Sequence, residues 1–144
     1  MQRMVPNKLL TCVSALDKSR LEALIEREFA DRALSSSAIK VLHRLRTADL
    51  VVQPDDVPRD LVTMNSTVRL VDPIGCEEWE LTLVYPEEHD PEENCWSILS
   101  TVGAEVFGHR IYQPTRAKRP DSESASWVVA DIPFQPEARN WMTM

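Results

Sequence analysis

Several features that mark common classes of protein are missing from this sequence. No apolar run approaches the roughly 18–20 residues that a membrane-spanning helix needs, and the N-terminal stretch lacks the apolar block and small-residue cleavage site of a secretory signal. The cysteines Cys12, Cys76 and Cys95 are odd in number and widely spaced, without a C-x-x-C pair. That spacing argues against a disulfide framework and against a zinc knuckle. We therefore expect a cytoplasmic protein with reduced thiols, and without a membrane partner, a metal ion or another cofactor.

Basic side chains are scarce in the middle of the chain. Residues 51–109 contain two basic and thirteen acidic side chains, whereas residues 1–50 contain nine basic and six acidic ones. Residues 110–144 contain five basic and four acidic side chains, which brings the formal net charge to −7. Because phosphate backbones repel an acidic surface, we expect no strong direct binding to nucleic acid. Solubility is the first explanation of this acidic surface. Binding to a protein partner with a basic face is the alternative explanation.

Residues 16–50 are predicted to form two amphipathic helices. Apolar side chains recur there at helical spacing: Leu21, Leu24, Ile25 and Phe29, then Ala38, Val41, Leu42 and Leu45. Ser14 or Asp17 can cap the first helix, and the serines at 35–37 can cap the second. Two such helices with a short connection fold back on each other to bury both apolar stripes. We expect an antiparallel hairpin, a short coiled coil, whose arms of about 12–13 residues measure roughly 20 Å.

The pattern changes to a period of two after residue 52. Two prolines and two aspartates within residues 53–58 end the helical part. We therefore place a boundary between a hairpin domain of residues 1–52 and a second domain of residues 53–144. The clearest strand covers residues 78–85, where every second side chain is apolar: Trp79, Leu81, Leu83 and Tyr85.

Further strands are predicted around residues 68–70, 95–99 and 127–132. A short helical turn at 104–107 and a loop at 113–126 lie between the last two. Strands that follow one another through turns favour an antiparallel sheet. The predicted fold class is α+β, with a short antiparallel helical hairpin followed by an antiparallel sheet with one short helix.

Four stretches of the chain resemble the bacterial GreA/GreB transcript-cleavage factor family. They are DLVTMNSTVRL at 60–70, LTLVYP at 81–86, SILSTVGAEVFGHR at 97–110 and FQPEA at 134–138. Their order is that of the family, and the likeness is closest to its short branch called Rnk, the regulators of nucleoside diphosphate kinase. The chain departs from the family at Thr101, where proline is usual, and it lacks the family's V-G-D and P-G-G turns after the short helix.

The resemblance implies an FKBP-like C-terminal domain that binds RNA polymerase at the rim of its secondary channel, with the coiled coil pointing inward. It assigns the polymerase contact to one turn and the short helix after it, formed by Ser100, Thr101, Val102, Gly103, Val106 and Phe107. From the residues alone, Ser100 or Thr101 is also suited to cap that helix. The two roles are compatible.

The cleavage factors carry acidic residues at the tip of the coiled coil, which help to hold a second magnesium ion. Here the hairpin tip offers Glu28 and Asp31, with Arg32 beside them. The cleavage factors' arms are about twice as long, so with the same docking these carboxylates would end some tens of ångströms short of the ion. We therefore expect a solvated tip, with neither a metal site nor catalytic residues.

The function expected from this reading is that of a non-enzymatic regulator of transcription elongation. It would bind core RNA polymerase at the secondary channel, compete with the longer cleavage factors and not stimulate cleavage. One alternative is a regulator that binds another protein, such as a nucleoside diphosphate kinase, through the acidic face. A second is an FKBP-like prolyl isomerase, for which two tyrosines and three phenylalanines offer few aromatic side chains to line a pocket.

Overall fold

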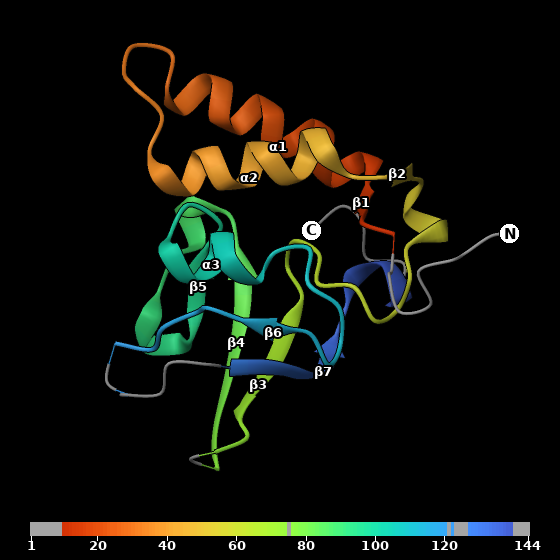
Figure 1. The fold of residues 1–144 in the computed structure, drawn as a ribbon. Coiled ribbons are helices and arrows are strands. Elements are labelled where there is room, and N and C mark those ends of the chain that lie inside the picture. Colours follow the sequence, from red (N-terminus) through yellow and green to blue (C-terminus); the bar gives the residue numbers. More distant parts are fainter. Residues whose placement is uncertain (1–9, 75, 121, 123–126, 140–144) are drawn as a thin grey trace, which may run out of the picture.

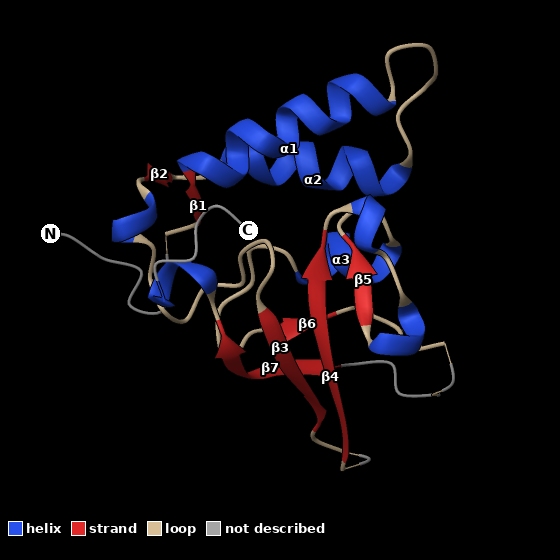
Figure 2. Cartoon of the chain, turned by 180° about the vertical axis from the view of Figure 1, so that it is seen from behind, coloured by secondary structure: helices blue, strands red, loops and turns tan. Residues whose placement is uncertain are grey.

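The computed structural model describes residues 10–74, 76–120, 122 and 127–139. It has a mixed α+β fold in which two helices lie across one end of a curled β-sheet (Figure 1). The view from behind shows the same two helices side by side above the strands (Figure 2). The α+β class is the predicted one.

The two helices are short. Helix α1 (Ala15–Glu28) has 14 residues and α2 (Ser36–Thr47) has 12, so they measure about 21 Å and about 18 Å. Each begins at a serine whose hydroxyl oxygen accepts a hydrogen bond from the backbone amide three residues on, at 3.3 Å for Ser14 and 3.1 Å for Ser35. The lengths and the serine caps of these helices are those expected from the sequence.

A two-stranded parallel sheet, which the sequence did not indicate, joins the two helix ends. Strand β1 (Cys12–Ser14) runs directly into α1 and pairs with β2 (Leu50–Val52), which follows α2. The helical part therefore ends before residue 50, and that part of the prediction was wrong. Asp49 accepts a hydrogen bond from the Thr11 amide at 2.9 Å, and its own amide donates to the Thr11 hydroxyl at 2.8 Å. These partners are 38 residues apart, so local periodicity carries no sign of them.

The main sheet has five strands. They are β3 (Thr67–Asp72), β4 (Glu77–Val84), β5 (Cys95–Ser97), β6 (Pro114–Thr115) and β7 (Trp127–Phe134). Their order across the sheet is β5-β4-β3-β7-β6. Strand β4 has the predicted alternation: Trp79, Leu81 and Leu83 are buried, while Glu78 and Glu80 between and beside them are exposed.

The sheet is mixed, which corrects the prediction of an antiparallel sheet. Strand β3 pairs antiparallel with β4 and β7, but β4 and β5 run parallel. The residues between β4 and β5 form two 3-10 turns, Pro86–Glu88 and Pro91–Glu93, which return the chain to lie beside the last three residues of β4. The predicted loop of residues 113–126 contains β6, and its residues 121 and 123–126 lie outside the described residues.

The predicted short helix is α3 (Thr101–Val106), which begins three residues earlier than expected. Gly108 follows it with a φ of +83°, in the left-handed region that favours glycine just past a helix end. Two more 3-10 turns, Pro54–Asp56 and Pro136–Arg139, flank the sheet in sequence.

One apolar core joins the helices to the sheet. Its most deeply buried large side chains include Leu21, Val41 and Leu45 from the helices and Val68, Leu70, Leu81, Leu83 and Trp127 from the strands. Trp79 is buried as expected, and the half-buried Trp96 lies edge-on to it with ring centroids 5.9 Å apart. The boundary after residue 52 stays a prediction. In the described parts of the chain, no helix is long and apolar enough to cross a bilayer.

Candidate functional site

The predicted polymerase-contact residues lie together at the start of α3. The Ser100 hydroxyl accepts a hydrogen bond from the Gly103 amide at 3.0 Å and donates one to the Ser97 carbonyl oxygen at 2.6 Å. Gly103 packs so closely on the end of β5 that a Cβ atom there would lie 2.0 Å from the same carbonyl oxygen. A larger residue at 103 would therefore push α3 away from β5.

Only part of this turn faces solvent. Thr101 is exposed and Ser100 is half-buried, whereas Val102, Val106 and Phe107 are 4%, 0% and 2% exposed. The three buried side chains belong to the apolar core and hold α3 in place from within. The surface that the turn can offer to a partner is therefore narrow and centred on Thr101.

An ionic cluster fastens α2 to α3. The buried carboxylate of Glu105 accepts hydrogen bonds from Lys40 Nζ at 2.6 Å and from the Arg116 amide at 3.0 Å. Arg44 donates to the Glu105 carbonyl oxygen at 3.1 Å and lies 3.3 Å from His109 Nδ1. Burial alone would raise the pKa of Glu105, but the hydrogen bonds from Lys40 and the Arg116 amide outweigh it and hold the pKa below its ordinary value.

His109 is the uncharged member of this cluster. Burial, together with the guanidinium of Arg44 beside it, lowers the pKa of His109 to about 4, although the Glu105 carboxylate opposes the shift. At neutral pH the imidazole is therefore neutral. Lys40 then binds the Glu105 carboxylate and Arg44 binds the Glu105 backbone carbonyl oxygen, and both contacts hold α2 against α3.

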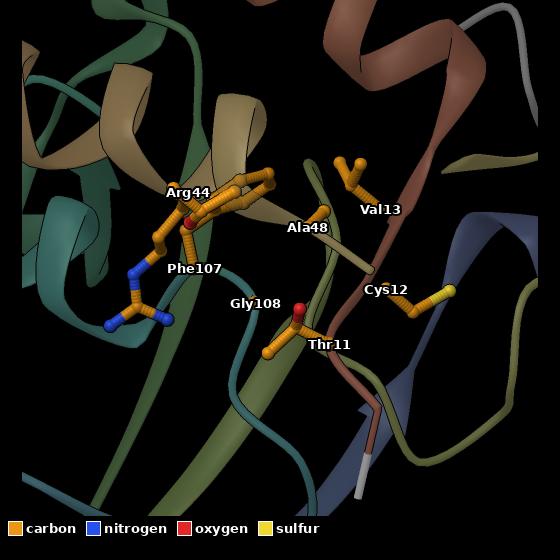
Figure 3. Close-up of a pocket in the computed structure, with 8 residues that line it drawn as sticks. Thr11, Cys12, Val13, Arg44, Ala48, Phe107 and Gly108 are labelled. Carbon is orange, nitrogen blue, oxygen red and sulfur yellow. The ribbon is translucent and has the colours of Figure 1, made fainter. Parts of the chain in front are cut away.

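A small cavity lies where β1, the end of α2 and the residues after α3 meet (Figure 3). Its volume is about 70 Å³, and Thr11, Arg44 and Phe107 are among the residues around it. That volume corresponds to roughly two water molecules, which is too small for a nucleotide or a peptide. The Cys12 sulfur points away from Phe107 (Figure 3), and burial raises the pKa of the Cys12 thiol, so this group is a poor nucleophile.

The predicted tip residues Glu28, Asp31 and Arg32 lie at the end of α1 and in the connection to α2. Arg32 donates to the Glu28 carbonyl oxygen at 3.0 Å, and its guanidinium lies 3.8 Å from the Glu28 carboxylate and 4.6 Å from the Phe29 ring centroid. Glu28 and Asp31 are both exposed. Among the described residues, no group of three or more His, Cys, Asp or Glu side chains could hold a metal ion. The tip is thus a solvated surface with one local ion pair.

Residues 63–66, Thr-Met-Asn-Ser, form a buried turn that the sequence did not assign to any site. The Thr63 amide donates to the Ser66 hydroxyl oxygen at 3.1 Å. Asn65 has a left-handed φ of +65°, and its amide donates to the Leu83 carbonyl oxygen at 2.7 Å. Asparagine tolerates this conformation better than most residues, so the turn can close against the end of β4.

The same turn binds side chains from both ends of the described chain. The Met64 amide donates to Asp17 Oδ2 at 3.1 Å, and the Thr63 hydroxyl donates to Glu137 Oε1 at 2.8 Å. Burial, with the charge of Glu137 nearby, raises the pKa of Asp17 to about 7, although the Met64 amide opposes the shift. In the sequence, residues 63–66 stand out only as an unusual polar tetrapeptide ahead of a strand. Their role could not be predicted because their partners lie 47 and 74 residues away.

Comparison with known proteins agrees with this architecture. The family described as "Transcription elongation factor, GreA/GreB, C-term" matches residues 57–133. The regulator of nucleoside diphosphate kinase of Escherichia coli (strain K12) is 28% identical over 127 residues, which are 88% of this chain and 90% of that protein. Transcription elongation factor GreA of Dehalococcoides mccartyi is 33% identical over 95 residues, 66% of this chain and 60% of that factor.

A solved structure extends the likeness to three dimensions. The prokaryotic transcription elongation factor GreA/GreB from Nitrosomonas europaea superimposes with a TM-score of 0.72 at 32% identity, over 88% of this chain and 100% of that one. At 88% of this chain, the superposition extends well beyond residues 57–133, to which the family match is limited. The chain therefore belongs to the GreA/GreB family of transcription elongation factors.

Proposed function

We propose that this protein docks on core RNA polymerase at the rim of the secondary channel and regulates transcription without stimulating transcript cleavage. The observation that carries the proposal is the length of the helices, 14 and 12 residues, on a chain whose sheet domain matches GreA/GreB factors. The sheet domain would be the FKBP-like anchor, and the helical hairpin would stand at the channel entrance. There it would exclude the longer cleavage factors by competition.

The contact with polymerase would centre on the exposed Thr101 at the start of α3. Ser100 shapes this turn by capping the helix, and the close packing of Gly103 on Ser97 holds it against β5. Val102, Val106 and Phe107 would support the contact from the core rather than touch the partner, since all three are buried. Threonine, in the slot where the family usually has proline, leaves a hydroxyl group on this surface.

We expect no stimulation of cleavage because the two helices are too short to bring their acidic tip to the second magnesium ion. Helix α1, about 21 Å long, ends at Glu28, and α2, about 18 Å long, begins at Ser36 after the connection that contains Asp31. The Lys40–Glu105 contact at 2.6 Å holds α2 against α3. Arms of about twice that length carry the acidic tip of the cleavage factors. A carboxylate that stops so far from the second magnesium ion cannot share it, because such ligands bind at about 2.0–2.1 Å.

A pull-down with core polymerase tests the docking half of the proposal. Wild-type protein should be retained, and Thr101→Arg should weaken retention by about tenfold or more, because a long cation replaces a small side chain at the centre of the contact. Ile74→Arg is the matched control, since it adds the same cation at a side chain that is 91% exposed in the turn between β3 and β4. Loss of retention in the control, or full retention of Thr101→Arg, would refute the assigned surface.

A transcript-cleavage assay on stalled complexes tests the other half. The wild-type protein should leave the transcript intact and should reduce cleavage when it is added together with a GreA factor. The Glu28→Ala and Asp31→Ala variants should behave like wild type in both reactions. Cleavage that depends on either carboxylate would overturn the reach argument.

One observation favours a second candidate, binding to a nucleoside diphosphate kinase. The Escherichia coli relative is named as a regulator of that enzyme and matches over 90% of its length. An acidic segment between β4 and β5 would supply the contact, and its exposed carboxylates are Glu87, Glu88, Asp90, Glu92 and Glu93. Co-purification with the kinase that persists in about 0.5 M salt would argue against such a mainly electrostatic contact.

A further inference from the structure

Two carboxyl groups from opposite ends of the described chain converge on the buried turn of residues 63–66. Asp17, near the start of α1, accepts a hydrogen bond from the Met64 amide at 3.1 Å. Glu137, in the last 3-10 turn, accepts one from the Thr63 hydroxyl at 2.8 Å. Neighbouring residues of one tight turn thus bind both carboxyl groups, and the charge of Glu137 acts on Asp17.

The surroundings of Asp17 disfavour a charge on its carboxyl group. Asp17 is 4% exposed, and burial, with the charge of Glu137 adding to it, raises its pKa to about 7. Arg20, one turn further along α1, opposes this shift less strongly than Glu137 promotes it. Tyr85, just after β4, is a further titratable group near Asp17. Burial and the charge of Asp17 raise the pKa of Tyr85 to about 12, so the phenol stays neutral.

The last 3-10 turn, Pro136–Arg139, is held less firmly than α1. Helix α1 is fixed to the core by apolar side chains such as Leu21, which is 0% exposed. In Pro136–Arg139 the first residue is buried, but the last two are exposed. The hydrogen bond from Thr63 to Glu137 ties this turn to the rest of the fold. In Figure 1 the turn is the blue coil below β1, close to the start of α1.

We propose that residues 136–139 act as a clip, which is closed on the turn of residues 63–66 while Asp17 holds a proton and is released when Asp17 loses it. Release separates the two carboxylates and lets water solvate both charges. The apolar contacts of α1 keep the helix in place, so the change is local. The clip operates whether or not the protein binds polymerase.

The direction of the pH dependence follows from the two states of Asp17. With the clip closed, the pKa of Asp17 is about 7, and with the clip released it moves toward the ordinary aspartate value of about 4. Release therefore becomes more favourable as the pH rises from about 4 to about 7, and it levels off above that range. A fall of the pKa by one unit on release corresponds to a tenfold change in the equilibrium.

Hydrogen exchange of the full chain, followed by NMR, tests the clip. The Met64 amide binds Asp17, whereas the Leu83 amide binds the Ser66 carbonyl oxygen of the same turn at 3.0 Å from the sheet side. After correction for the intrinsic exchange rate, the protection of Met64 should fall by about tenfold or more between pH 5 and pH 8. The protection of Leu83 should not change. A constant protection of Met64, or an equal fall at both amides, would overturn the proposal.

Two matched substitutions test the role of the proton on Asp17. Asp17→Asn keeps an oxygen that accepts the hydrogen bond from Met64 but has no proton to lose at neutral pH, so Met64 should stay protected at pH 8. Asp31→Asn makes the same change at the exposed hairpin tip and should retain the pH dependence of the wild-type protein. Circular dichroism checks that both variants are folded. The same pH dependence in both variants would contradict the assignment to Asp17.

Glu137→Gln tests the second carboxyl group. Glutamine still accepts the hydrogen bond from the Thr63 hydroxyl but carries no charge, so the pKa of Asp17 should fall. Carbon-13 NMR of the Asp17 carboxyl group should therefore show a midpoint near pH 7 in the wild-type protein and a lower one in the variant. Glu28→Gln, at the exposed tip, should leave the midpoint unchanged. If Asp17 titrates alike in Glu137→Gln and in the wild-type protein, the proposed clip is wrong.

Discussion

Two contacts that hold α1 and α2 in place each contain a buried carboxyl group, and the pKa of that group is shifted in opposite directions in the two. At the first, Asp17 of α1 meets the buried turn of residues 63–66, and at the second, Glu105 of α3 meets α2. The two side chains are almost equally buried, at 4% and 8% exposure. Yet the pKa of Asp17 is raised to about 7, whereas the pKa of Glu105 is lowered. Burial penalises both charges, so the neighbours decide the sign.

Those neighbours differ in kind. Glu105 has the ammonium of Lys40 and a backbone amide within hydrogen-bonding distance. Asp17 has a backbone amide and, close by, a second carboxyl group, Glu137, whose effect on the pKa of Asp17 exceeds that of the nearby Arg20 guanidinium. Of these two buried carboxyl groups, only Glu105, which accepts a hydrogen bond from a cation, has a lowered pKa.

His109 gives the second contact a pH dependence that opposes that of the first. Between pH of about 4 and about 7, the unfolded chain releases the Asp17 proton while the folded chain keeps it, so stability falls as the pH rises. Over a similar range, the unfolded chain binds a proton on His109 that the folded chain does not bind, so stability rises with pH. The pH dependence that comes from each residue should become visible when the other residue is replaced by one that does not titrate.

The largest effect is expected from Asp17→Asn. Asparagine still accepts a hydrogen bond from the Met64 amide and carries no charge beside Glu137 and Arg20. At pH 8 the variant should be more stable than wild type by up to about 4 kcal/mol, and the gain should vanish below pH of about 4, where the wild-type carboxyl is protonated in both states. Urea unfolding from pH 4 to pH 8 measures it. Asp31→Asn at the exposed tip is the control, and a gain independent of pH would contradict the raised pKa.

A somewhat smaller effect of opposite slope is expected from His109→Gln. The glutamine cannot take up a proton, so the variant should lose the part of the pH dependence that comes from a pKa lowered to about 4. Relative to wild type, its unfolding free energy should improve by up to about 3 kcal/mol between pH 7.5 and pH 4.5. His43→Gln, on the exposed face of α2, should leave the profile unchanged. An unchanged profile in His109→Gln would mean that the imidazole titrates alike in both states.

Glu105→Gln should cost about 2 kcal/mol at pH 7, because it removes the charge that Lys40 and the Arg116 amide stabilise. The pKa of Glu105 is lowered, so its stabilising charge is present at neutral pH and is lost as the pH falls below the ordinary carboxyl range of about 4. The difference from wild type should therefore shrink in acid. Thermal unfolding at pH 7 and pH 3 measures this, and a difference that grows in acid would count against the assignment.

The smallest effect is expected from Lys40→Met. The Lys40 side chain is 47% exposed, so its ion pair should contribute less than about 1 kcal/mol, and 1 M salt should screen most of that. Chemical unfolding at low and high salt measures the change. A loss as large as that of Glu105→Gln would show that the buried carboxylate depends on Lys40 alone rather than also on the Arg116 amide.

Much of the fold followed from patterns within a few residues. The helical spacing of apolar residues and the capping serines predicted α1 and α2, because both signals act between residues one or two helical turns apart. The alternation from Trp79 to Leu83 predicted β4 for the same reason. The turn at Ser100 was predicted as both a cap and a contact, and its capping hydrogen bond to Gly103 is present.

The errors fall where distant residues decide. Strands β1 and β2 are only three residues each and exist because Asp49 meets Thr11. The parallel pairing of β5 with β4 depends on how the segment between them returns. The polymerase contact itself stays a prediction; the burial of Val102, Val106 and Phe107 is a further feature that their positions in a short motif did not reveal.

The order of residues was enough to set the lengths of α1 and α2 to within a few residues, because rise per residue is a local constant. Only the folded chain decided which carboxyl groups carry charge. Asp17 and Glu105 are alike in chemistry and in burial, and they differ because the fold brought Lys40 to one and Glu137 to the other. Electrostatic energy depends on distances in space, and those are set by contacts between residues far apart in the chain.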